Sequence, residues 1–214
     1  MTKSNSIIKN DKEIMRLLEY FSNEAEFKKK YKIIVGVDEV GRGPLAGPVY
    51  AACVCLKYDF NLINLNDSKK LTEEKRNILE NKIKENSYFY TYGYASVEEI
   101  DKYNILNATM LAMKRAVDKC SIKPDLVLVD GNKLPDWEYE CLCIIKGDQK
   151  FPSIAAASIL AKTKRDKIMN IIQTIDNKFN YSKHKGYGTK EHYDELKLNG
   201  PSILHRRTFL KDYK

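Results

Sequence analysis

Three short apolar segments of the chain end in acidic residues. Asp38 and Glu39 follow the run YKIIVGV, Asp130 ends DLVLVD, and Asp148 ends CLCIIKGD. A single acid at a strand end is common, but neighbouring strands of one sheet bring such carboxylates close together. Carboxylates in close contact raise one another's pKa unless a cation neutralises them. The pattern therefore predicts a site for a hard divalent cation, which binds through oxygen ligands.

The chemistry that such a site supports is displacement at phosphorus. Two divalent ions about 3.5–4 Å apart can stabilise the attacking and the leaving oxygen together. No histidine or cysteine belongs to the set, which favours Mg²⁺ or Mn²⁺ over zinc. Asp38 and Glu39 would point to opposite faces of an ideal strand, so both can serve one site only if the strand has ended at Asp38. The alternative is that these acids are solvated turn residues.

Two further motifs suggest rival sites. Gly41-x-Gly43-x-x-Ala46 matches a dinucleotide-binding fingerprint, but Pro48 and the β-branched residues after it offer no helix N-terminus to hold phosphates. Two Cys-x-Cys pairs could form a zinc site, although their spacing is shorter than is usual for zinc and they lie inside apolar runs. We favour buried, reduced thiols. The cysteines are Cys53, Cys55, Cys120, Cys141 and Cys143.

Hydrophobic periodicity predicts the elements that must position the acids. Thr72 is typical of a helix N-cap, and Ser96-x-x-Glu99 is typical of a capping box that starts a short helix. The alternation of predicted strands and helices indicates one α/β domain with additional helices in its C-terminal part. The predicted strands are 31–38, 49–57, 87–97, 125–131 and 141–148, and the other predicted helices are 11–29, 72–86, 104–119, 153–172 and 189–198.

The net charge indicates which classes of molecule the protein is expected to bind. The chain has 214 residues and a net charge of +8, and residues 150–214 alone carry 14 basic and 6 acidic residues. A basic segment attracts polyanions such as nucleic acid, although 30 of the 37 basic residues are lysine, which composition bias alone can produce. No apolar run approaches the roughly 18 residues of a membrane span, and the N-terminus lacks a signal-peptide core. We expect a cytoplasmic protein without a membrane partner.

Six motifs follow one another along nearly the whole chain, from about residue 33 to 210. They are VGVDEVGRGPLAGPV (35–49), NDSKKL (66–71), LVLVDG (126–131), KGD (146–148), SIAAASILAKTKRD (153–166) and KGYGTKEHY (185–193). In this order and spacing they resemble the bacterial ribonuclease HII family. The resemblance implies a ribonuclease H-like fold, a five-stranded mixed sheet flanked by helices with a C-terminal helical extension. We expect one catalytic domain over 1–214, with an N-terminal helical extension at 1–30 and helical substrate-binding elements at about 175–214.

The resemblance also implies an activity. Such enzymes cleave the RNA strand of RNA–DNA hybrids and incise 5′ of single ribonucleotides in duplex DNA, in replication and repair, leaving 3′-hydroxyl and 5′-phosphate ends. We expect two Mg²⁺ or Mn²⁺ ions with substrate, and a monomer. Two alternatives stay open: a non-catalytic hybrid-binding module, and a ribonuclease HIII-like enzyme. The latter family lacks the arginine at the position of Arg42 and carries a further N-terminal domain.

Site residues follow from the resemblance position by position. The four metal-binding carboxylates fall on Asp38, Glu39, Asp130 and Asp148, the same acids that end the apolar segments. The turn Gly41-Arg42-Gly43 is similar to the element whose backbone contacts the ribose 2′-hydroxyl, the group that separates RNA from DNA.

Other matched positions concern the nucleic-acid backbone and the C-terminal part. Tyr187 matches a tyrosine that packs on the nucleotide 3′ of the ribonucleotide. Lys69, Lys70 and Lys162 match positions that contact phosphates, although a lysine in so lysine-rich a chain is otherwise a solvated surface group. Arg206 and Arg207 are expected to pack or to contact phosphate. The histidines lack zinc-like spacing and are expected to be structural or to face phosphate; they are His184, His192 and His205.

Overall fold

Five strands form one mixed sheet with the order β3-β2-β1-β4-β5. The computed structural model describes residues 15, 18–57 and 72–210. β1, β2 and β3 form an antiparallel meander, and β4 and β5 add to it in parallel with β1. The predicted fold class is confirmed. The strands are β1 (Ile34–Val40), β2 (Val49–Leu56), β3 (Ser87–Ala95), β4 (Leu126–Asp130) and β5 (Cys141–Ile144).

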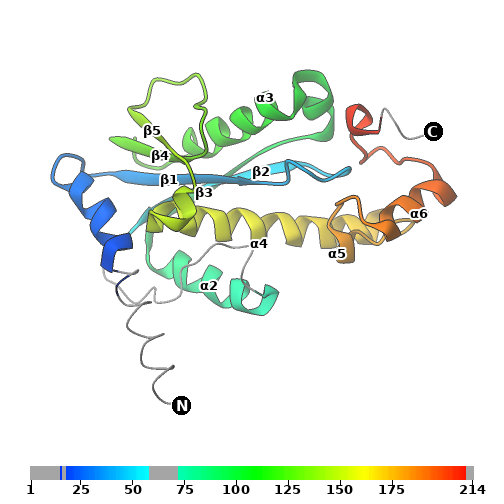
Figure 1. Cartoon of the computed structure of the whole chain (residues 1–214), viewed down its shortest axis with the longest axis horizontal. Helices are drawn as coiled ribbons and strands as arrows, with labels where there is room; N and C mark the ends of the chain where they lie inside the picture. Colours follow the sequence, from blue (N-terminus) through cyan, green and yellow to red (C-terminus); the bar gives the residue numbers. More distant parts are fainter. Residues whose placement is uncertain (1–14, 16–17, 58–71, 211–214) are drawn as a thin grey trace, which may run out of the picture.

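Helices cover both faces of the sheet (Figure 1). α3 packs on one face, while α4 and α2 pack on the other. The short helices α5 and α6 follow the C-terminal end of α4, and residues 18–28 form a further helix before β1. None of these described helices is long and apolar enough to span a membrane. Their bounds are α2 (Glu73–Glu85), α3 (Val97–Val117), α4 (Pro152–Ile175), α5 (Tyr181–His184) and α6 (Lys190–Asn199), with 3₁₀ turns η2 (Gly147–Gln149) and η3 (Arg207–Phe209).

Helix caps lie where local sequence signals predicted them. The Thr72 side chain accepts a hydrogen bond at the start of α2, and Ser96 and Glu99 form both halves of a capping box at the start of α3. Asn104 has a non-helical φ of 64° within α3, and its side chain caps the second part of that helix. The two helices predicted on either side of residue 104 are thus one kinked element. The motif NDSKKL (66–71) lies outside the described residues.

Small residues let α4 approach β1 closely. Ala155, Ala156 and Ala157 are fully buried against the sheet. A Cβ atom on Gly36 would lie only 2.2 Å from the carbonyl carbon of Ser153, which is far inside van der Waals contact. This backbone contact sets the depth at which the start of α4 lies beneath β1.

Two predicted strand ends are wrong. β1 continues past Asp38 to Val40, because Glu39 and Val40 still pair with β2. β5 ends at Ile144, so Asp148 does not end a strand; it lies in the η2 turn that follows. The acids remain near the sheet edge, but the fourth one arrives from a turn.

The cysteine zinc site is excluded by topology. Cys53 and Cys55 lie on β2 and Cys141 and Cys143 on β5, with β1 and β4 between them. Three strand spacings of about 4.8 Å separate the pairs by roughly 14 Å. The cysteines are free thiols as expected, but only Cys53 and Cys55 are buried. Cys120 and Cys141 are partly exposed and Cys143 is exposed, so the prediction of burial is wrong for these three.

We predict that Gly36→Ala lowers the free energy of unfolding by about 3 kcal/mol, because the new methyl group forces β1 away from α4. Gly43→Ala is the matched control, since its Cβ would meet a side chain only at 3.9 Å; we expect a change within about 0.5 kcal/mol. Urea unfolding measures both. Equal stability of the two variants would contradict the close packing described.

Candidate active site

Asp38 and Glu39 leave β1 on opposite faces. Asp38 pairs with Ala52, which packs under α4, whereas Glu39 pairs with Ala51, which packs under α3. Directly opposed residues of antiparallel strands project to the same face. Asp38 therefore faces α4 and is buried, while Glu39 faces α3 and is partly exposed.

Asp130 joins these two acids at the end of β4. Val37 and Val129 are paired in the parallel register of β1 and β4, so Asp38 and Asp130 follow at neighbouring strand ends. One Asp130 carboxylate oxygen accepts a hydrogen bond of 2.6 Å from the Gly147 amide. The next residue along the chain is Asp148, which lies in the η2 turn directly after the amide that bonds to Asp130.

Charge coupling links the three strand-end acids. Burial, followed by the charges of Glu39 and Asp130, raises the pKa of Asp38 well above its usual value. Burial and the charge of Asp130 also raise the pKa of Glu39, against a lowering by Arg42. Negative charge at the strand ends is therefore incompletely neutralised by the protein. The strand does not end at Asp38, so the two carboxylates leave on opposite faces, and charge coupling still links them.

The donor set fits a hard divalent cation. Every acidic group at this edge offers oxygen ligands, and their mutual repulsion favours a bound cation. Within the described part of the chain, no three His, Cys, Asp or Glu side chains converge as a ready metal site. Electrostatics and donor chemistry, rather than a closed coordination shell, thus indicate the cation.

Two hollows meet at Glu39 and Arg42, whose side chains pair at 3.5 Å. One hollow, of about 320 Å³, extends along α3 and includes Asp130. The other, of about 520 Å³, is lined by the turn Gly41-Arg42-Gly43 together with Tyr187 and Phe209. The structure thus places the turn and Tyr187 on one groove beside Glu39.

Two buried arginines hold the turn from behind. Arg206 donates hydrogen bonds to the carbonyl oxygens of Gly41, Arg42 and Gly47. Burial and the nearby charge of Arg165 lower the pKa of Arg206 to about 9. Because Arg206 is fully buried, its expected packing role is confirmed and contact with a phosphate is excluded.

Arg165 makes an equivalent set of bonds from α4. Its guanidinium donates to the carbonyl oxygens of Ala46, Pro48 and Lys185. Sequence reasoning gave Arg165 no role, although it lies in a quoted motif. An arginine within an otherwise apolar helix face was the signal available. Arg207, by contrast, is exposed, and its backbone amide bonds to Asp101.

A histidine pair fixes the backbone at Tyr187. The Ser202 amide donates to His205 Nδ1, so the Nε2–H of His205 donates to His192 Nε2 at 3.0 Å. The remaining His192 proton, on Nδ1, then donates to the Tyr187 carbonyl oxygen, also at 3.0 Å. Both rings are buried, and burial lowers their pKa values, which favours the neutral forms.

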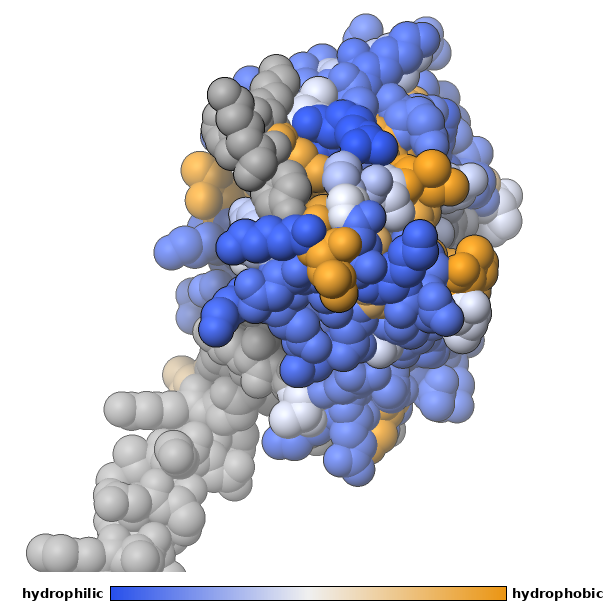
Figure 2. All heavy atoms as spheres, turned by 90° about the vertical axis from the view of Figure 1, so that its right-hand side faces the viewer, coloured by the Kyte–Doolittle hydropathy of each residue, from blue (hydrophilic) through white to orange (hydrophobic). Residues whose placement is uncertain are grey.

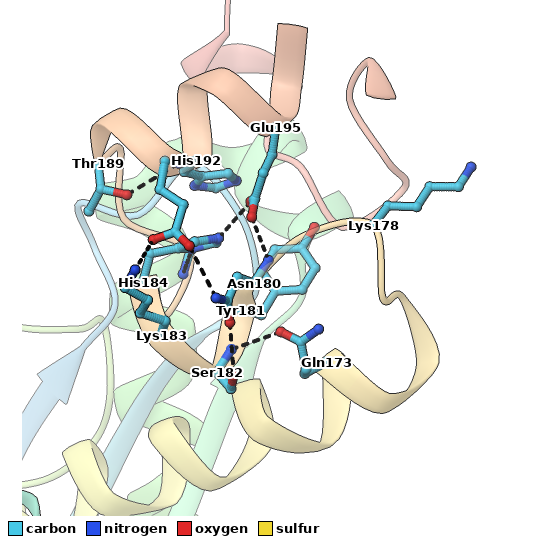
Figure 3. A network of polar contacts seen from close by, with 12 residues as sticks. Gln173, Lys178, Asn180, Tyr181, Ser182, Lys183, His184, Thr189, His192 and Glu195 are labelled. Carbon is cyan, nitrogen blue, oxygen red and sulfur yellow. Dashed lines mark hydrogen bonds and ion pairs between the residues drawn. The ribbon is translucent and has the colours of Figure 1, made fainter. Parts of the chain in front are cut away.

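The third histidine closes the same network (Figure 3). His184 accepts the Gly186 amide at Nδ1 and donates from Nε2 to Glu195 at 3.0 Å. Its ring stacks on His192, with centroids 4.1 Å apart. Burial of all three histidines confirms a structural role and excludes the phosphate-facing alternative.

The candidate phosphate-contacting lysines are only partly observed. Lys162 lies near Tyr187, with its Nζ 6.0 Å from the ring centroid, and pairs with Asp166 at 2.6 Å. Burial lowers the Lys162 pKa. Lys69 and Lys70 lie outside the described residues. Figure 2 views the end of the molecule that carries the C-terminal helices, where the described surface is mostly hydrophilic.

Comparisons with known proteins identify similar sequences. The family model "Ribonuclease HII" matches residues 35–211. A ribonuclease HII of Pelagibacter ubique is 54% identical over 179 residues, covering 83% of this chain and 96% of the relative. One of Clostridioides difficile is 46% identical over 205 residues, covering 96% of this chain and 80% of the relative.

Solved structures support the fold. The ribonuclease H2 of Pyrococcus horikoshii superposes with a TM-score of 0.65 at 24% identity, covering 82% of this chain and 92% of that one. A Bst-RNase HIII in complex with Mn²⁺ superposes with a TM-score of 0.59 at 16% identity, covering 78% of this chain and 63% of that one. At these identities the likeness concerns the fold alone.

We predict that Arg206→Lys lowers the free energy of unfolding by about 2–4 kcal/mol, because a single ammonium cannot replace the guanidinium fork and buried carbonyls lose their partners. Arg207→Lys, a change at the adjacent exposed position, is the control, and we expect it to stay within about 0.5 kcal/mol. Denaturant unfolding of both variants measures this. An Arg206→Lys protein as stable as the parent would show that the fork does not hold the turn.

The three buried histidines should make the folded state less stable as the pH drops from 6.5 towards 4. Burial lowers the pKa of all three histidines below the ordinary value of 6.5, to about 4 for His205. At these histidines the unfolded chain then binds more protons than the folded one, so they favour unfolding in acid. The raised pKa values of Asp38 and Glu39 act in the opposite sense. Unfolding midpoints measured across the window test this, and His205→Gln should flatten the slope. An unchanged slope in that variant would contradict the neutral histidine pair.

Proposed function

The chain belongs to the ribonuclease HII family, and on that premise we propose its substrates and the residues that act on them. The chain is accordingly a type 2 ribonuclease H, a metal-dependent endonuclease. We propose that it hydrolyses the RNA strand of RNA–DNA hybrids and incises duplex DNA 5′ of a single ribonucleotide. The products would carry 3′-hydroxyl and 5′-phosphate ends.

The observation that carries this proposal is the coupled group of acids beside the groove. Asp38 is buried with a raised pKa, and the charges of Glu39 and Asp130 contribute to that shift. The groove next to it is lined by a glycine-rich turn and an exposed tyrosine. An acidic site that favours a bound cation lies beside a surface that suits a sugar and a base. This arrangement supports the proposal that the protein cleaves a nucleic-acid backbone.

We assign four acids as the metal ligands: Asp38, Glu39, Asp130 and Asp148. The metal is Mg²⁺ or Mn²⁺, with two ions when substrate is bound, and Mn²⁺ is present in the complex of the structurally similar RNase HIII. When bound, the ions supply activation of the attacking water and stabilisation of the leaving 3′-oxygen.

The chain's own residues prepare these ligands. The Glu39 amide donates to one Asp38 oxygen at 2.7 Å and so fixes that carboxylate. Arg42 lowers the pKa of Glu39, which favours the ionised form that binds a cation. The Gly147 amide orients Asp130 in the same way.

Selection of a ribonucleotide would fall to the turn and to Tyr187. Arg206 occupies the carbonyl oxygens of Gly41 and Arg42, so we propose that the amide side of the turn meets the 2′-hydroxyl. Tyr187 is 39% exposed, and a Cβ on Gly43 would lie 3.9 Å from its ring. An exposed ring beside the turn supports the proposal that Tyr187 packs on the nucleotide that follows the ribonucleotide.

The wider proposal covers organisation and setting. It includes a single catalytic domain over 1–214, with the extension at 1–30 and substrate-binding elements at about 175–214. Lys69, Lys70 and Lys162 would contact phosphates. We also propose a monomer that acts in the cytoplasm in replication and repair. The family match supports ribonuclease HII over the HIII alternative, and the presence of all four acids speaks against a non-catalytic module.

We predict that Asp130→Asn lowers incision by about 100-fold or more, because a neutral amide is a poor ligand for a hard cation. Asp136→Asn makes the same change at an exposed position and should leave the rate unchanged. The substrate is a labelled DNA duplex with one ribonucleotide, incubated in Mg²⁺, Mn²⁺ or EDTA. All-DNA and all-RNA duplexes serve as controls.

Each outcome is informative. Metal-dependent incision 5′ of the ribonucleotide supports both the reaction and the selection by the turn and Tyr187. Cleavage of long hybrids alone would keep the metal site and overturn that selection. Normal turnover by Asp130→Asn would refute the ligand assignment, and binding without cleavage would favour the non-catalytic module.

A further inference from the structure

The helix before β1 bonds directly to the segment that carries Asp148. The Tyr20 hydroxyl donates to the Asp148 carbonyl oxygen at 3.0 Å. Asn23 Nδ2 donates to the Lys150 carbonyl oxygen at 3.2 Å. The helix of residues 18–28 lies beside the start of α4 in Figure 1. Residues about 128 positions apart in sequence thus meet within one short turn.

Burial shows that the contact is a packed one. Tyr20 is 1% exposed and belongs to the core cluster beneath α4. Phe27 packs against Phe151, with ring centroids 5.9 Å apart. The helix of residues 18–28 therefore packs on the rest of the protein at the start of α4. This packing holds the polar side chains of the helix in fixed positions.

Glu24 adds a third polar contact, at the start of α4. Phe151 is the N-cap residue of α4 and supplies no side-chain cap. The fully buried Glu24 instead accepts the Ser153 amide at 3.0 Å. An acceptor from elsewhere in the chain thus serves one of the amides that a helix start leaves unpaired. This fixes the end of the segment that begins at Gly147.

The opposite end of the segment is held by the active site. The Gly147 amide donates to Asp130, and Lys146 turns the chain there with a left-handed φ of 56°. Asp148 therefore lies between two anchors. One is the carboxylate of another proposed ligand, and the other is the hydroxyl of Tyr20.

We propose that the helix of residues 18–28 positions the fourth metal ligand, with Tyr20 and Asn23 as positioning residues for Asp148. The inference rests on the proposed function, in which Asp148 is a ligand. Groups that orient metal ligands from behind commonly change metal affinity about 10–100-fold when removed. Freed from Tyr20 and Asn23, the turn samples more conformations, and cation binding then carries the entropic cost of ordering it.

The test removes the two contacts and leaves the packing. Tyr20→Phe keeps the ring and deletes the hydroxyl, and Asn23→Ala is combined with it. Tyr31→Phe is the matched control, since its hydroxyl bonds to the exposed Glu140 and not to the segment 147–151. Mn²⁺ binding to each protein is measured by calorimetry. Hydrogen exchange reports the amides of 147–151, and incision is measured against Mn²⁺ concentration.

We expect the double variant to bind Mn²⁺ about tenfold more weakly, with faster exchange at 147–151 and a rate that recovers at high Mn²⁺. Tyr31→Phe should match the parent in all three measurements. Unchanged Mn²⁺ affinity in the double variant, or an equal loss in Tyr31→Phe, would overturn the inference. Asp148→Asn separates the two levels: if it binds Mn²⁺ as well as the parent, the ligand assignment itself fails.

Discussion

Repulsion among carboxylates at the ends of β1 and β4 is the constraint on which the rest of the structure depends. Burial alone would favour neutral acids, yet Arg42 and the amides of Glu39 and Gly147 stabilise their charged forms. The protein thus leaves part of the negative charge for a cation to neutralise. The fold without a metal can therefore bind a divalent ion. Its stability is lower than it would otherwise be, because like charges remain close together.

Holding such a site requires rigid support, and the chain provides it from distant segments. Arg165 on α4 and Arg206 near the C-terminus bind carbonyl oxygens of one loop. The pair His192 and His205 fixes the backbone at Tyr187. In each case a buried side chain orders backbone beside the groove, so the surface that would meet nucleic acid stays free for contact. Buried hydrogen bonds therefore connect the C-terminal part to the loop that follows β1.

Structural features that depend on neighbouring residues could be predicted from the sequence, whereas features that depend on contacts between distant segments could not. The caps at Thr72 and Ser96 depend on residues within one helical turn, and both are confirmed. The end of β1 was misplaced because pairing with β2 decides it, and no single segment reports its partner. Arg206 resembles a phosphate-binding residue in sequence; only its burial shows otherwise. The candidate acids were found because each follows its own apolar run, although the turn that carries Asp148 was read as a strand.

The most direct test of the central claim is a crystal structure of the protein with Mn²⁺ and an uncleavable duplex that contains one ribonucleotide. We expect anomalous scattering from two ions, each about 2.0–2.3 Å from carboxylate oxygens of the four assigned acids. The ribonucleotide should lie in the groove between the turn and Tyr187. Manganese bound elsewhere, or a duplex that avoids this groove, would contradict the account.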